Sequence, residues 1–202
     1  MQKKRESTLL NDVAKNELNL LDMALVESNI STLNEGAKLI SLLEDGQYTQ
    51  GFKPAFQSTI GAHFRHVLEH YRCFESQQPS STFCYDLRER DQLLECDSEY
   101  ALNTINELIA FLQTVSDEMS DQIYYVEDEQ TSKQVVTSLN RELLFLQSHT
   151  VHHYAIIAAM TRAFGNQPEE EFGVAIATRT HNEKCAEKTK PTAVAKGAIC
   201  AQ

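Results

Sequence analysis

The stretch FLQSHTVHHYAII, residues 145–157, places three histidines within five positions of an otherwise apolar run. A second stretch, IGAHFRHVLEHY at 60–71, holds three more, so these two segments contain six of the seven histidines in the chain. A buried imidazole needs partners for both of its ring nitrogens. How the two segments fold, and what those nitrogens contact, are therefore the first questions that the sequence raises.

The first stretch has the periodicity of an amphipathic helix. Because each helical residue turns about 100°, His149 and His153 lie one turn apart, within about 40° of arc. His152 lies at the edge of that arc. The apolar residues on the same face are Phe145, Leu146, Ile156, Ile157 and Met160.

The histidines of the second stretch share a helical face in the same way. His63, His66 and His70 fall within about 60° of one another. The apolar residues of that arc are Phe56, Ile60, Val67 and Phe74. The histidines of both helices thus lie on or beside the faces that should form the core, not on the solvated faces.

The rest of the chain also favours helices. Only 7 glycines and 4 prolines interrupt it, and the long segments between them repeat apolar residues at spacings of three and four. We expect an all-α four-helix bundle with an up-down-down-up or a crossover connection. A small hairpin is expected before the last helix, because β-branched and aromatic residues flank a polar centre there. The helices are predicted at 29–45, 55–76, 97–119 and 138–165, the hairpin at 121–138, and a charged loop or single turn at 83–91.

Three parts of the chain are predicted. Residues 1–22 form a mostly polar N-terminal arm, residues 23–180 form the bundle, and residues 181–202 form a flexible C-terminal tail rich in Lys, Ala and Thr. The 202 residues are enough for one domain with a sizeable core.

The charge of the chain limits its partners. The formal net charge is −11 at pH 7, which disfavours nucleic acids and anionic membranes because both attract a positive surface. No run approaches the roughly 18 apolar residues that span a bilayer, and the N-terminal region has no signal-peptide core. The five cysteines are odd in number and form no Cys-x-x-Cys pair, so we expect reduced thiols. A cytoplasmic protein is expected, with neither a nucleic acid nor a membrane as its partner.

A divalent metal ion would satisfy several of the histidine rings at once. Two histidines at i and i+4 on one helix are the simplest way to hold one ion, and His149 and His153 have that spacing. A third ligand from the facing helix, for which we choose His66, leaves positions open for water or substrate, as catalytic sites require. The alternative is that the histidines are hydrogen-bonded core groups without a metal.

The remaining histidines of the two stretches have several interpretations. His63, His70 and His152 are surplus to a three-ligand site. Each is a candidate fourth ligand, general base or hydrogen-bond partner of a ligand. For each of the three, a purely structural role explains its position at least as well as a role in the metal site.

Two polar features accompany the histidines. Glu142, two turns before His149, is either an acceptor that orients a ligand imidazole or a carboxylate favoured at the positive end of the helix dipole. We also count Glu142 among the candidate catalytic residues. In the segment YDLRERD, Tyr85, Arg88 and Arg90 are candidates for binding an anionic substrate group. Such a cluster is more often a solvated, salt-bridged loop.

These motifs resemble those of the DinB/YfiT-like superfamily of metal-dependent four-helix-bundle proteins. STIGAHFRH at 58–66 is similar to the second-helix segment of that family, and HTVHH at 149–153 is similar to the His-x-x-x-His pair of its last helix. The resemblance covers about residues 30–165. It implies a metal held by the final histidine of the first motif and by the histidine pair of the second.

The resemblance implies less about the reaction. Members of the superfamily include transferases and an isomerase that use low-molecular-weight thiols, and many members are stress-induced proteins. Bundles of this kind often dimerise, so a homodimer is one expectation. The ion would be zinc, nickel or iron(II), all of which accept imidazole ligands.

Three hypotheses follow for the function. The first is a metal-dependent enzyme of hydrolase or thiol S-transferase type, whose ion activates water or a thiol. Its substrate would be a small molecule, with a low-molecular-weight thiol as one candidate. The second is a non-catalytic metal-binding bundle of the stress response. The third is a metal-free helical interaction protein.

Overall fold

The computed structural model describes residues 21–189, apart from 52, 117–118 and 120–121. The predicted N-terminal arm lies almost wholly outside the described residues, and so does the part of the predicted tail from 190 onward. The division of the chain into arm, bundle and tail therefore stays a prediction.

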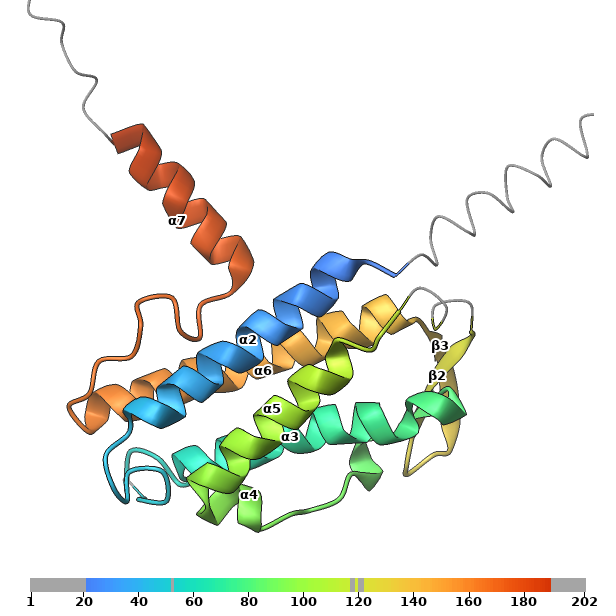
Figure 1. Ribbon diagram of the computed structural model, residues 1–202, viewed down its shortest axis with the longest axis horizontal. Coiled ribbons are helices and arrows are strands. Elements are labelled where there is room, and N and C mark those ends of the chain that lie inside the picture. Colours follow the sequence, from blue (N-terminus) through green and yellow to red (C-terminus); the bar gives the residue numbers. More distant parts are fainter. Residues whose placement is uncertain (1–20, 52, 117–118, 120–121, 190–202) are drawn as a thin grey trace, which may run out of the picture.

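Four long helices form the body of the molecule (Figure 1). They are α2 (Met23–Leu42), α3 (Ile60–Gln77), α5 (Ser98–Leu112) and α6 (Leu139–Ala163). Helix α2 packs against α5 and α6, and α3 packs against the same two helices. The consecutive helices α2 and α3 therefore occupy opposite corners, as do α5 and α6. Helices α2 and α6 run in one direction and α3 and α5 in the other (Figure 1), and the connections from α2 to α3 and from α5 to α6 cross between opposite corners. This arrangement confirms the predicted four-helix bundle, with an up-down-down-up order.

Capping side chains set where these helices begin. In each case a side-chain oxygen accepts a hydrogen bond from a backbone N–H of the first turn. The capping residues are Asp22, Thr59, Asp97 and Ser138. The predicted start of the first helix at 29 was wrong, because the cap at Asp22 allows the helix to begin at Met23. The predicted start of the second at 55 was also wrong, because Thr59 is extended and helical geometry begins only after it.

Three bundle helices also end earlier than predicted, α6 by only two residues, at Ala163. Helix α2 stops at Leu42, before a turn in which Gly46 has a φ of 83°. Helix α5 stops at Leu112 rather than at 119. Short elements connect the bundle helices. They are the 3-10 turns η1 (Gln78–Ser80) and η2 (Tyr85–Leu87) and the one-turn helix α4 (Leu93–Cys96).

A three-stranded sheet lies at one end of the bundle (Figure 1). Strands β2 (Tyr124–Asp128) and β3 (Lys133–Thr137) form the predicted hairpin, with Tyr125 opposite Val136. Strand β1 (Thr82–Phe83) adds to β2 in parallel, with Thr82 opposite Tyr125. Only a loop or a single turn was predicted there. The pairing fixes the segment that follows β1, which carries Tyr85 and Arg88.

Aromatic side chains attach this sheet to α3. Phe83 and Tyr124 are fully buried and stack with ring centroids 5.5 Å apart. Phe83 also stacks on Phe74 of α3 at 5.2 Å. An isolated hairpin is marginally stable in water, and these contacts supply the apolar support that it needs.

The core lies between the four helices. All four helices contribute large apolar side chains that are at most 1% exposed. These include Leu33, Ile60, Phe64, Leu68, Tyr71, Phe74, Ile105, Leu108, Leu143, Leu146, Tyr154 and Ile157. Among the described residues, no helix combines the length and the apolar character that crossing a bilayer requires.

The close approach of α3 to α4 depends on Gly61. A Cβ at this position would clash with the backbone oxygen of Glu95 and lie 2.7 Å from the ring of Tyr48. We expect Gly61→Ala to lower the free energy of unfolding by about 1–3 kcal/mol through overpacking. Since a backbone atom cannot move aside by changing rotamer, this cost outweighs the gain of up to about 1 kcal/mol that Ala has over Gly in a helix.

Urea denaturation of the Gly61→Ala variant measures this effect. Gly51→Ala is the matched control, because a Cβ at Gly51 meets no atom of the described part of the chain within 4 Å. Its stability should stay within about 0.5 kcal/mol of the wild type. Equal stabilities of the two variants would show that α3 and α4 are not packed as described.

Helix α7 (Ile176–Thr189) extends away from the bundle (Figure 1). Its first turn is attached to α2 by Arg179, whose two terminal nitrogens donate to the two carboxylate oxygens of Glu35 at 2.8 Å each. The predicted boundary of the tail at 181 falls within this helix. The polar composition of this segment led to the prediction of a flexible tail. The segment is instead helical, and the ion pair between Arg179 and Glu35 holds it against α2.

Candidate metal centre

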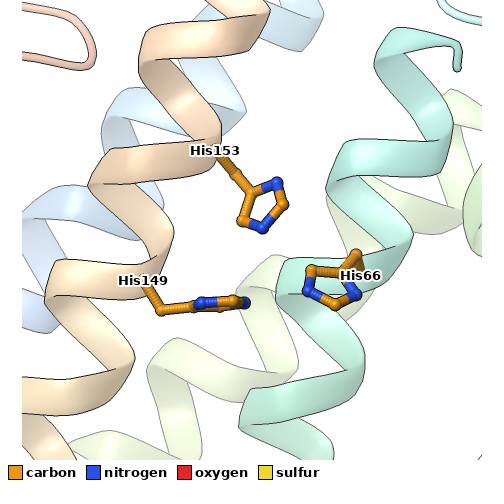
Figure 2. A group of neighbouring side chains, drawn as sticks. All are labelled: His66, His149 and His153. Carbon is orange, nitrogen blue, oxygen red and sulfur yellow. The ribbon is translucent and has the colours of Figure 1, made fainter. Parts of the chain in front are cut away.

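Three histidines meet where α3 faces α6 (Figure 2). His66 comes from α3, and His149 and His153 come from consecutive turns of α6. One ring nitrogen of each lies within 4.8 Å of the corresponding nitrogen of the other two. The ring centroids are 4.6–4.9 Å apart. In Figure 2, a nitrogen of each ring points toward the other two rings.

These distances suit a metal ion. Bonds from zinc to imidazole nitrogen are about 2.0–2.1 Å long, so the ligand nitrogens of one ion lie at most about twice that length apart. The three rings would reach such an arrangement through small side-chain adjustments. The cluster of His66, His149 and His153 is therefore able to hold a metal ion.

The electrostatics of the cluster favour neutral rings. Burial, reinforced by the neighbouring histidines, lowers the pKa of His66 to about 3 and that of His153 to about 3. Burial also lowers the pKa of His149. At neutral pH each ring then keeps a lone pair for a metal. The Nε2 atom of His149 is buried and has no hydrogen-bond partner among the residues that the structure describes, which is the condition that a bound ion would relieve.

His63 lies beside His153, outside the three-histidine cluster. Its Nδ1 is 2.9 Å from the Nδ1 of His153, and its Nε2 is 2.8 Å from the Ser58 hydroxyl. Burial lowers the pKa of His63 as well. His63 thus contacts a candidate ligand directly.

His70 lies on the opposite side of His66 and is also outside the cluster. Its Nδ1 donates to the backbone oxygen of His66 at 2.6 Å, and its ring is 4.5 Å from that of His149. Burial lowers its pKa to about 4. His152 is exposed and lines a separate cavity of about 360 Å³ between α6 and the start of α7.

Glu142 is buried at the start of α6. One of its carboxylate oxygens accepts from the Tyr85 hydroxyl at 2.8 Å, and the other accepts from the Thr137 hydroxyl at 2.6 Å. The carboxylate therefore ties the segment after β1 and the end of β3 to α6. Burial and the nearby Glu142 carboxylate raise the pKa of Tyr85 well above its usual value.

Arg88 reaches the edge of the cluster. Its Nη2 is 3.5 Å from the Nδ1 of His66, and its Nη1 donates to the Tyr85 backbone oxygen at 2.8 Å. Its Nε lies 3.5 Å from the buried Glu69 carboxylate. Of the predicted substrate-binding residues, Tyr85 and Arg88 thus lie beside the histidines, whereas Arg90 is exposed.

Three residues that support the site were not predicted from the sequence. Glu69 balances the charge of Arg88, Ser58 contacts His63, and Thr137 contacts Glu142. Carboxylates on helices are usually solvated, so the spacing of residues on this helix gave no sign that Glu69 is buried. The other two lie in connections whose course depends on the packed structure.

The lowered pKa values predict how stability varies with pH. His66 and His153 have pKa values of about 3 in the folded protein and the ordinary 6.5 when unfolded, so the unfolded chain takes up protons first as the pH falls. The associated stability is present above pH 6.5 and is lost toward pH 3. We expect the urea midpoint of the metal-free protein to fall between pH 7 and pH 5. A His66→Gln/His153→Gln variant should fall less, and equal slopes would contradict the prediction.

Comparison with known proteins concerns the fold. No protein-family model and no curated protein matches the sequence. Among solved structures, the crystal structure of a DinB-like protein, YjoA from Bacillus subtilis, matches with a TM-score of 0.51 and 16% sequence identity. The match covers 71% of this chain and 94% of that chain. The chain therefore has a DinB-like fold, as its motifs predicted.

Proposed function

We propose that this chain is a metal-dependent enzyme whose divalent ion is held by His66, His149 and His153. The observation that carries the proposal is the convergence of three imidazoles from two helices, with one nitrogen of each within 4.8 Å of the others. The unpartnered Nε2 of His149 supports it, because buried polar atoms in a metal-free core normally have a partner. The DinB-like fold supports it as well.

Three protein ligands favour catalysis over a structural role, because structural sites are usually closed by four. When bound, a divalent ion lowers the pKa of a water or thiol and so provides a nucleophile at neutral pH. We assign the reaction to the hydrolase or thiol S-transferase type, with a small-molecule substrate. Zinc, nickel and iron(II) all suit a set of imidazole ligands.

The side chains around the three histidines would position that substrate. His70, Tyr85 and Phe145 form an aromatic wall, with ring centroids 5.1–6.2 Å apart. Glu142 holds Tyr85 in place through the hydrogen bond from its hydroxyl. Arg88 shares its charge with the buried Glu69, so it is better suited to orienting a polar substrate group than to neutralising a full negative charge.

Activity with defined metals tests the proposal. The full-length protein is stripped with a chelator and reloaded with zinc, nickel or, without oxygen, iron(II). One assay follows ester and amide hydrolysis, and a second follows the loss of free thiol from low-molecular-weight thiols mixed with electrophiles. We expect turnover in one assay that requires metal and is lost in His66→Ala.

The control variant is His181→Ala, which removes the histidine of α7 instead. It should retain both metal and turnover. Stoichiometric metal binding without turnover in either assay would favour the non-catalytic metal-binding alternative. No metal binding by the wild type would contradict the proposal altogether.

A further inference from the structure

A chain of three side chains leads from the metal centre to the connection before α3. The Nδ1 atoms of His153 and His63 lie 2.9 Å apart, and the Nε2 atom of His63 lies 2.8 Å from the Ser58 hydroxyl. Ser58 and His63 are both half-buried. The chain begins at a candidate ligand and includes one of the histidines that a three-ligand site does not use.

The contact between two nitrogens restricts where the protons lie. Two Nδ1 atoms at this distance form a hydrogen bond only if one carries a proton and the other has a lone pair. In the first arrangement, His153 donates to His63, and the Nε2–H of His63 donates to Ser58. In the second, Ser58 donates to the Nε2 of His63, and the Nδ1–H of His63 donates to His153. Because a serine hydroxyl both donates and accepts, each arrangement satisfies all three groups.

Only the first arrangement is compatible with a metal. The Nδ1 of His153 is engaged by His63, so the nitrogen left for an ion is its Nε2. In Figure 2, one nitrogen of this ring points toward His66 and His149. In a neutral imidazole a proton on Nδ1 leaves the lone pair on Nε2, whereas the second arrangement places a proton where the ion would bind.

We propose that His63 is a positioning residue that holds His153 in the Nδ1–H form, with its Nε2 lone pair directed to the metal. His63 is then not a ligand, and Ser58 completes the chain by accepting from its Nε2–H. The inference rests on the proposed metal site and assigns a role to one of the surplus histidines. It also predicts that metal binding sets the direction of the entire chain.

Zinc affinity measured by calorimetry tests this role in the full-length protein. His63→Phe keeps an aromatic ring but removes the acceptor, and we expect it to weaken zinc binding about 10–100-fold, as loss of an outer partner of a ligand does. His63→Asn restores an oxygen acceptor near the position of Nδ1 and should recover most of the affinity. His152→Ala removes a neighbouring histidine that makes no such contact and should stay within about threefold of the wild type.

A spectroscopic measurement separates this role from general packing. Imidazole ¹⁵N spectra of the zinc-loaded wild type should show His153 protonated on Nδ1 and His63 protonated on Nε2. Wild-type zinc affinity in His63→Phe, or a proton on the Nδ1 of His63, would overturn the inference while leaving the metal site intact. Failure of the wild type to bind zinc, nickel or iron(II) would overturn both proposals.

Discussion

A His149→Ala/His153→Ala variant is expected to bind zinc at least about 100-fold more weakly than the wild type. It loses two of three ligands, a larger change than the loss of an outer partner, which costs about 10–100-fold. Both residues lie on consecutive turns of α6, so the two substitutions are confined to one short segment of the helix. The remaining His66 would hold an ion no better than an exposed surface histidine does. Calorimetry, with elemental analysis of the dialysed protein, measures the effect.

Folding controls accompany this variant. The histidine rings are half-buried, so their removal leaves most of the core unchanged, and circular dichroism should show wild-type helix content. The His181→Ala variant loses a histidine outside the cluster, and the His152→Ala variant loses only an exposed ring that contacts His153 at its edge. Both should keep wild-type affinity. Zinc binding by the double variant at wild-type strength would show that the ion binds elsewhere on the protein.

Phe64→Ala should lower the free energy of unfolding by about 3–5 kcal/mol, as large-to-small changes at buried aromatic residues do. Phe64 lies on α3 between His63 and His66 and is completely buried. Its ring contacts those of Tyr48 and Tyr154, with centroids 5.9 Å and 5.7 Å away. The substitution removes these contacts and leaves a cavity between α3 and the rings of Tyr48 and Tyr154.

Urea denaturation at pH 7 measures the loss. Leu144→Ala on α6 is the control, because half of the Leu144 surface is exposed and truncation there should cost about 0.5 kcal/mol or less. Zinc should raise the midpoint of the Phe64→Ala variant, since a ligand that binds the folded state stabilises it by mass action. A loss below about 1 kcal/mol would be inconsistent with the packing of α3.

The helices could be predicted because their signal is local. Apolar spacing identified all four bundle helices, and the i, i+4 pattern identified His149 and His153 as a pair on one face. The predicted helix ends were less accurate. A single capping residue such as Asp22 or Thr59 decides where a helix begins, and the spacing of apolar residues does not reveal it. Strand β1 was missed because its two residues are too short to show alternation and its partner is far along the chain.

The choice among the α3 histidines required more than spacing. His63, His66 and His70 share one helical face, and only the axial alignment of α3 with α6 separates them. In the structure, His63 lies level with His153, His70 level with His149, and His66 between them. His66 was chosen as the third ligand and the motif resemblance agreed with that choice, and the tertiary packing explains why this residue meets both members of the pair.

The crossover arrangement of the bundle has a consequence for folding. The two helices that carry the three histidines are adjacent in space but are separated in sequence by α4, α5 and all three strands. An ion bound by both His66 and His149 would therefore act as a reversible cross-link that closes this long loop. Such a cross-link restricts the unfolded chain much as a disulfide does. The amount of available metal would therefore control the stability of the folded protein as well as its activity.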